Sequence, residues 1–138
     1  MIYDATQNIY DAFQEQGLHC TIQETDDTSF IRAQCSAENC DYEILFISRD
    51  NDNDVSVRIY NLIKFPAEKM ATVCEAVNTC NRTYRFLRFV ADDDNTVVVN
   101  YDIPLKANNV GEIAVEICIR SMRIVSECYS LLMHALYA

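Results

Sequence analysis

The feature that most constrains this chain is a series of four segments in which apolar and polar residues alternate. They are LHCTIQE (18–24), SFIRAQCS (29–36), DYEILFIS (41–48) and VSVRIYNLI (55–63). A period of two is typical of β-strands that bury one face, and these segments are rich in β-branched and aromatic residues. The stretches between them, such as ETDDT and RDNDND, carry residues typical of turns. The sequence therefore predicts a meander of four antiparallel strands.

Helical spacing replaces this alternation before the first strand. In YDATQNIYDAFQEQG, Asp4 and Gln7 have the spacing of a capping box, in which each side chain bonds the backbone of the other residue. Gly17 is a natural stop, because glycine readily adopts the left-handed conformation that follows many helices. We expect a helix over residues 4–16.

A second helix is expected in KFPAEKMATVCEAVNTCN, where Pro66 suits the first helical position and residues 78–81 close the helix. Two further strands follow, YRFLRFVA (84–91) and TVVVNYDI (96–103), joined by the turn DDDN. The last segment, 110–136, is a long helix whose apolar residues cover more than one narrow stripe. So wide an apolar face needs more than one packing partner.

The predicted order is αββββαββα, in which strands are grouped apart from helices. This grouping favours the α+β class, with helices packed on an antiparallel sheet. The 138 residues suit one domain with one core, so we expect a single domain over 1–138.

Two acidic segments resemble metal-binding loops but fit turns better. Asp92, Asp93 and Asp94 are adjacent between two strands, so their carboxylates cannot all point at one ion. In RDNDNDVSVRIYN, the aspartates match the start of a calcium-binding EF-hand loop, but Val55 replaces the required glycine and Asn61 the closing glutamate. We expect hairpin turns and no metal.

No arrangement typical of catalysis is found. The chain has seven cysteines without the paired CxxC spacing of structural zinc sites, and small buried hydrophobic thiols are the expected state. The two histidines, His19 and His134, have no nucleophile at a suitable spacing, and no phosphate-binding or nucleophile-elbow motif occurs. We expect no catalytic residues, no cofactor and no enzymatic activity.

The charge limits the partners. A net charge of −10 with only 11 basic residues argues against nucleic acid and against anionic membrane surfaces, because both are bound through Lys and Arg. No apolar run is long enough to span a membrane. The first residues lack the pattern of a signal peptide, and an odd number of thiols suits a reducing compartment. A cytoplasmic location is expected.

Alternation also divides the strand residues between two faces. One face is apolar and is expected to form the core under the helices. The other mixes aromatic residues and arginines, which are enriched in protein interfaces. The candidate interface residues are Phe30, Arg32, Arg58, Tyr60, Tyr84, Phe86 and Arg88. The alternatives to an interface are that this face is solvated or that a further helix covers it.

The second half of the chain resembles the YbjN-like bacterial domain. The resemblance lies in VSVRIYNLIKFPAEKMATVCEAVN followed by NRTYRFLRFVADDDNTVVVNYDIPL, and the order of the earlier elements agrees with it. It implies a fold similar to the type III secretion chaperones, which are small acidic domains that dimerise and bind client polypeptides. Members of the family are described as regulators of sensory transduction, with no established catalysis. No site residues follow from the resemblance.

The leading hypothesis is therefore a non-catalytic protein- or peptide-binding module, resembling a secretion chaperone and acting as a regulator. It is expected to form a homodimer through the mixed face or the long last helix, and to hold a protein or peptide client. The alternative is a regulatory domain that senses a small ligand in a pocket between sheet and helices.

Overall fold

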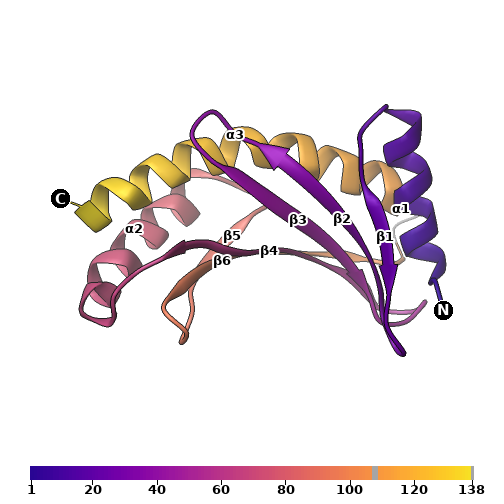
Figure 1. Cartoon of the computed structure of the whole chain (residues 1–138), viewed down its shortest axis with the longest axis horizontal. Helices are drawn as coiled ribbons and strands as arrows, with labels where there is room; N and C mark the ends of the chain where they lie inside the picture. Colours follow the sequence, from indigo (N-terminus) through magenta and orange to yellow (C-terminus); the bar gives the residue numbers. More distant parts are fainter. Residues whose placement is uncertain (107–108, 138) are drawn as a thin grey trace.

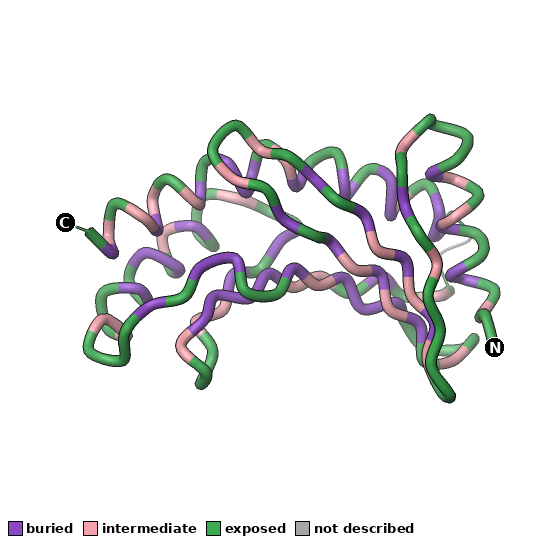
Figure 2. Tube along the Cα trace, viewed as in Figure 1, coloured by how far each residue is buried: buried purple, intermediate pink, exposed green. Residues whose placement is uncertain are grey.

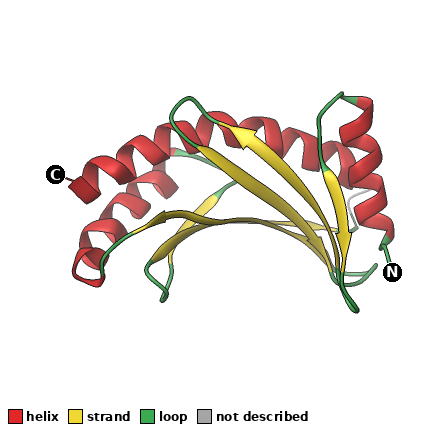
Figure 3. Ribbon diagram, viewed as in Figure 1, coloured by secondary structure: helices red, strands yellow, loops and turns green. Residues whose placement is uncertain are grey.

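The computed structural model describes residues 1–106 and 109–137, and within them it contains one six-stranded sheet and three α-helices (Figure 1). The helices are α1 (Asp4–Glu15), α2 (Met70–Thr83) and α3 (Val110–Tyr137), with one 3-10 turn, η1 (Ala67–Lys69), before α2. The strands are β1 (Thr21–Glu24), β2 (Ser29–Ser36), β3 (Asp41–Ser48), β4 (Asp54–Lys64), β5 (Arg88–Ala91) and β6 (Thr96–Pro104). The predicted α+β class and the order αββββαββα are confirmed (Figure 3).

All neighbouring strands pair antiparallel, in the spatial order β1-β2-β3-β4-β6-β5. The first four strands form the predicted meander. The last two form a hairpin that places β6, not β5, beside β4. A bulge interrupts β4 between Ile59 and Ile63, where Asn61 adopts a positive φ of 55°.

One face of the sheet carries the apolar residues that the alternation assigned to the core. They line up across the strands in register, as Ile31 pairs with Phe46 and Phe89 with Val99. The members of this covered face that are at most 4% exposed include Ile31, Ala33, Cys35, Ile44, Phe46, Val55, Val57, Ile59, Phe89, Val97, Val99 and Ile103. Figure 2 shows the resulting alternation of buried and more exposed residues along the strands.

Helix α3 connects the whole helical layer. It packs against α1 near its start and against α2 near its end, and it also contacts β2, β4 and β6 (Figure 1). The expectation that its wide apolar face needs more than one partner is confirmed. The crossing with α1 is close, because a Cβ atom at Gly111 would lie 2.7 Å from the backbone oxygen of Asn8 and 2.9 Å from the Cβ of Ala12.

The outer edge of β5 is occupied by a side chain. The amide of Asn81, in α2, donates from Nδ2 to the carbonyl of Phe89 (2.9 Å) and accepts at Oδ1 from the N–H of Phe89 (2.8 Å). The side-chain amide thus makes the two bonds that a neighbouring strand would make.

The ends of α1 differ in part from the prediction. The residue that caps the helix is Tyr3, without a side-chain hydrogen bond, and Asp4 is already helical. Gln7 bonds Asp11 one turn later, so the predicted capping box does not form. At the other end, Gly17 has a φ of 69°, as predicted for the stop.

Helix α2 starts later and ends later than predicted. Pro66 precedes the 3-10 turn instead of occupying the first position of the helix, and the helix continues beyond 78–81 to Thr83. Its buried face consists of Val73, Ala76, Val77 and Cys80, while Cys74 is exposed. The expectation that the thiols are buried is therefore wrong for Cys74.

Among the described residues, no helix combines the length and apolar character needed to cross a membrane.

We expect the substitution Gly111→Ala to lower the free energy of unfolding by about 1–2 kcal/mol, because the added methyl group would press on the backbone of α1. Urea unfolding followed by circular dichroism measures the change. Glu112→Ala, at the exposed neighbouring position, is the matched control and should cause little loss. An unchanged urea midpoint for Gly111→Ala would contradict this expectation, because it would show that α1 and α3 can move apart without a loss of stability.

Candidate functional site

The face of the sheet opposite the helices, the open face, has no helix of the described residues over it. All three helices contact the covered face, where Phe13 of α1 meets Phe46 (ring centroids 5.7 Å apart) and Cys118 of α3 meets Cys35. Several side chains of the open face are nevertheless only partly exposed, among them Arg32, Leu45 and Arg58. A partly buried face without a partner is the natural place to look for a binding surface.

A single row of residues runs across the open face through all six strands. In spatial order it consists of Thr21, Arg32, Leu45, Arg58, Asn100 and Arg88, each paired in register with the next. Half of the row is arginine, in a protein with 11 basic residues and a net charge of −10. We call this set the arginine row.

The arginines of the row are held to different degrees. Arg58 donates from Nη1 to Oδ1 of Asp102 (2.8 Å) and to the carbonyls of Val57 and Tyr101, which holds its planar head against the sheet. Arg32 lies 3.7 Å from the carboxylate of Glu43, with its guanidinium 5.8 Å from the ring centre of Phe30.

Arg88, on β5, is exposed and makes no ion pair with the part of the chain described.

Apolar side chains lie between these charges. Phe30, Leu45, Ile47 and Val90 are half-buried, and Val98 is 7% exposed. The predicted interface set missed Leu45, Ile47 and Val90, although the same alternation in DYEILFIS and RFVA could have assigned them to this face.

Two polar atoms of the row have no partner. Nε of Arg32 and Oδ1 of Asn100 are buried, and neither is hydrogen-bonded within the described residues. Buried polar atoms are nearly always hydrogen-bonded, so each of these atoms leaves a bond to be made by water or by a bound partner.

Five of the seven predicted interface residues belong to β2, β4 or β5: Phe30, Arg32, Arg58, Tyr60 and Arg88. Tyr60, next to the bulge, is 49% exposed. Tyr84 and Phe86 do not lie on a strand, because β5 begins at Arg88 and not at Tyr84. Phe86 has a φ of 76°, which interrupts the alternation that the prediction assumed.

Tyr84 and Phe86 instead contact α3. The hydroxyl of Tyr84 donates to the carboxylate of Glu127, and the guanidinium of Arg120 lies 4.7 Å from the ring centre of Phe86. A surface groove follows this contact and includes Arg85 and Arg123 in its lining. The predicted placement of these two aromatic residues on the open face is therefore corrected.

The loop 49–54, considered above as a calcium loop, uses its first carboxylate internally. Asp50 accepts hydrogen bonds from the backbone N–H groups of Asp52 and Asn53 and from the Asn53 side-chain amide, at 2.9–3.0 Å. These bonds hold the pKa of Asp50 below its usual range, mainly through the backbone and the side chain of Asn53. The loop is a hairpin turn between β3 and β4, as predicted.

The loop 92–95 is likewise a turn. Asp92 accepts from the N–H of Asp93 (2.8 Å), and Asp94 accepts from both the N–H and the hydroxyl of Thr96 (3.2 and 2.6 Å). Asn95 has a φ of 63°, in the left-handed region that Asn tolerates. The described residues contain no cluster of three or more His, Cys, Asp or Glu side chains that could hold a metal ion.

Buried polar groups do occur between the sheet and α3. The hydroxyl of Tyr42 lies 2.7 Å from Oγ of Ser121, which donates in turn to the carbonyl of Cys118 (2.6 Å). Burial raises the pKa of Tyr42 well above its usual range, so this hydroxyl is a structural donor and not a base. His19 and His134 are both exposed, on the β1 side and near the end of α3.

A groove with a volume of about 440 Å³ runs between α1 and α3. It is lined by apolar side chains that include Val115 and Ile119, and by the carboxylates of Glu15, Glu112 and Glu116. Arg120 also lines the groove and is paired with Glu116 (2.7 Å). It lies between two helices, and not between sheet and helices as the ligand-sensing alternative expected.

The chain matches the model of a known protein family. The model of the YbjN family, whose description reads "Putative bacterial sensory transduction regulator", matches residues 6–126. The match covers most of the 138 residues, and it confirms the resemblance seen in the second half of the chain. No curated protein matches the chain.

The turn at Asp50 gives a pH-dependent prediction. Because the folded pKa of Asp50 is lowered, its carboxylate stabilises the fold above its unfolded pKa, and this contribution disappears as the pH falls through the folded value. The difference in unfolding free energy between wild type and Asp50→Ala should therefore be largest at neutral pH and narrow below about pH 4.

Urea unfolding at several pH values measures this difference. Asp52→Ala, in the same loop, is the control and should show no such narrowing, because only its backbone takes part in the turn. A difference that is constant with pH would contradict the assigned role of the Asp50 carboxylate.

Proposed function

Because this chain belongs to the YbjN family, we propose that it is a non-catalytic regulatory module that works by binding protein, and that it forms a homodimer through the open face of its sheet. The observation that carries the proposal is the arginine row with the half-buried apolar residues around it. The seven thiols of the chain suit a reducing compartment, and we therefore propose that the protein is located in the bacterial cytoplasm.

The composition of the open face supports an interface. Aromatic and aliphatic side chains alternate with arginines, the combination enriched where proteins bind one another. Leu45 and Ile47 lie near the centre of the sheet, on β3, where a partner would exclude water from them most completely. The gain is about 25 cal/mol for each Å² of apolar surface that a partner covers.

The charges of the open face support a second copy of this chain as the partner. A two-fold interface requires a surface that is complementary to itself. The open face carries both signs, with Arg32, Arg58 and Arg88 beside Glu43 and Asp102. Arg88 lacks an ion pair among the described residues, so a carboxylate of the second copy can pair with it. The net charge of −10 keeps such dimers from associating further.

Within this proposal, the dimer holds a protein or peptide client in the manner of a secretion chaperone. A dimer formed through the open face leaves the helical side of each molecule free to bind that client. The groove beside Tyr84 and Phe86 offers aromatic rings together with the guanidinium groups of Arg85, Arg120 and Arg123.

The groove between α1 and α3 favours a second candidate function, the sensing of a small ligand. Its volume of about 440 Å³ lies within the range of known ligand sites. Glu116 is paired with Arg120, but Glu15 and Glu112 make no ion pair among the described residues and would select a cationic compound. A thermal-shift screen with polyamines and amino acids tests this function. A ligand that binds the folded state raises Tm, and Glu112→Gln should reduce that rise.

The dimer is tested by substituting Leu45 at the centre of the open face. Wild type should have twice the chain mass of 15.8 kDa by light scattering, and Leu45→Glu should be monomeric with an unchanged circular dichroism spectrum. The matched control is Ile119→Glu, which places the same charge on the helical side at a residue that is 51% exposed, and it should remain dimeric.

Arg88→Glu, at an exposed position that tolerates substitution, is a second variant. It should weaken the dimer about tenfold, since it replaces an attraction by a repulsion. A monomeric wild type would overturn the homodimer. A dimer that Ile119→Glu dissociates and Leu45→Glu leaves intact would place the interface on α3.

A further inference from the structure

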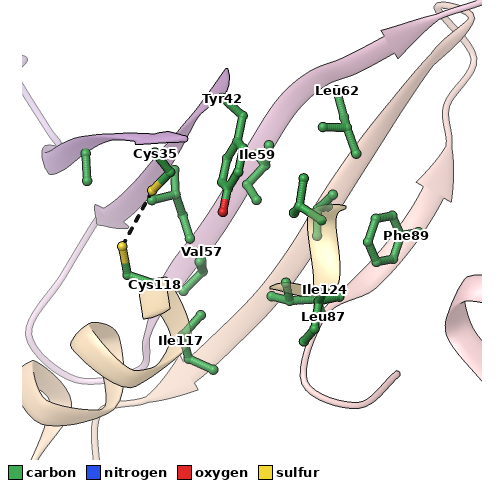
Figure 4. Close-up of a cluster of buried hydrophobic side chains, with 14 of the residues drawn as sticks. Cys35, Tyr42, Val57, Ile59, Leu62, Leu87, Phe89, Ile117, Cys118 and Ile124 are labelled. Atoms are coloured by element: carbon green, nitrogen blue, oxygen red, sulfur yellow. Dashed lines mark hydrogen bonds between the residues drawn. The ribbon is translucent and has the colours of Figure 1, made fainter. Parts of the chain in front are cut away.

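Two cysteines that are far apart in the sequence meet under α3. Sγ of Cys35, on β2, lies 3.6 Å from Sγ of Cys118, on α3 (Figure 4). Both residues are 4% exposed, and Tyr42 lies beside them (Figure 4). A disulfide requires sulfur atoms about 2.05 Å apart, so a movement of about 1.5 Å would bring this pair within bonding distance.

A second pair is found ten residues further along α3. Cys80, in the last turn of α2, and Cys128 are both 0% exposed in a region where α2 packs against α3, and each thiol shifts the pKa of the other. Each pair therefore joins α3 to a different neighbour, β2 in one case and α2 in the other. Of the remaining three thiols, Cys74 is exposed and Cys40 is half-buried.

We propose that Cys35–Cys118 and Cys80–Cys128 are two sites of reversible disulfide formation, which cross-link α3 to the sheet and to α2. The oxidant is a low-molecular-weight disulfide. This inference is independent of the proposed function, because it rests on the packing of α3 and not on the open face.

The reaction proceeds by two exchanges. The thiolate of Cys35 attacks one sulfur of the small disulfide, which forms a mixed disulfide and releases one small thiol. The sulfur of Cys118 then attacks the sulfur of Cys35 and releases the second small thiol. Two protein thiols are oxidised, one small disulfide is reduced, and the two protons leave with the two small thiols.

The surroundings of the first pair suit this order of attack. The hydrogen bond from Cys118 lowers the pKa of Cys35, and the thiolate is the form that attacks. The shared hydrogen bond, and after it burial, raises the pKa of Cys118, so Cys118 remains protonated until Cys35 has reacted. Cys80 and Cys128 show the same pattern, with the pKa lowered at Cys80 and raised at Cys128.

A small disulfide can reach Cys35 by local opening of the β2–β3 hairpin. This hairpin is held to α3 by polar contacts, from the N–H of Glu38 to Oγ of Ser126 (2.9 Å) and from the Asn39 amide to Ser126 and Ser130 (3.0 and 2.6 Å). A groove with a volume of about 260 Å³ lies along the same junction. Water can replace such bonds, so the hairpin can open without unfolding the domain.

The test is to incubate the full folded chain with oxidised glutathione, alkylate it under denaturing conditions and measure its mass. The reduced protein should carry seven alkyl groups. The oxidised protein should carry three, on Cys20, Cys40 and Cys74, and peptide mapping should find the two expected links. Dithiothreitol should restore seven.

Variants separate the two sites. Cys35→Ser should leave four alkylated thiols after oxidation, Cys118 among them, and retain the link between Cys80 and Cys128. Cys74→Ser is the matched control and should retain both links. The urea midpoint of wild type should rise on oxidation, because a cross-link restricts the unfolded chain, and the rise should be smaller in Cys35→Ser.

Three outcomes would overturn the proposal. One is seven alkylated thiols after oxidation. Another is the recovery of glutathione adducts without internal links. The third is a link from Cys118 to Cys20, a buried thiol close enough to influence the pKa of Cys118.

Discussion

The apolar surface of α3 can be buried only if several other elements surround it. The helix is 28 residues long, and thirteen of its residues are buried, on more than one side. The sheet covers one part of this surface, α1 covers the start and α2 covers the end. The approach of Gly111 to the backbone of α1 shows how closely these contacts are packed, and the two thiol pairs lie at the other two junctions.

The packing of α3 has a consequence for the sheet. With all three helices gathered on one face, the other face keeps its apolar side chains without a cover from the described residues. Arginines are suited to this position, because their stems pack along apolar neighbours while their guanidinium groups stay available. The head of Arg58 is already held by Asp102 and two carbonyls, whereas Arg88 makes no ion pair among the described residues.

Alternation along the sequence predicted that one face of the sheet is apolar and covered by helices, and the pattern of the segments predicted the order of the elements. It could not predict positions where the backbone leaves the strand conformation. Phe86, with its positive φ, is the clearest case, and it moves two aromatic residues from the sheet to α3. The expected burial of the thiols also failed at Cys74 of α2, which is exposed, while Cys80 of the same helix is buried. The thiol pairs were beyond prediction, since a periodic pattern assigns a residue to a face but does not reveal which distant residue meets it there.

The amide of Asn81 has a consequence for how the sheet can grow. Because it occupies the hydrogen-bonding groups of Phe89 on the outer side of β5, a foreign strand cannot add there without displacing it. At the opposite edge, β1 has only four residues, which gives an incoming strand few bonds. Short or occupied edges protect sheet proteins from pairing edge to edge. Even at high concentration, copies of this protein are therefore hindered from joining their sheets edge to edge into a continuous fibre.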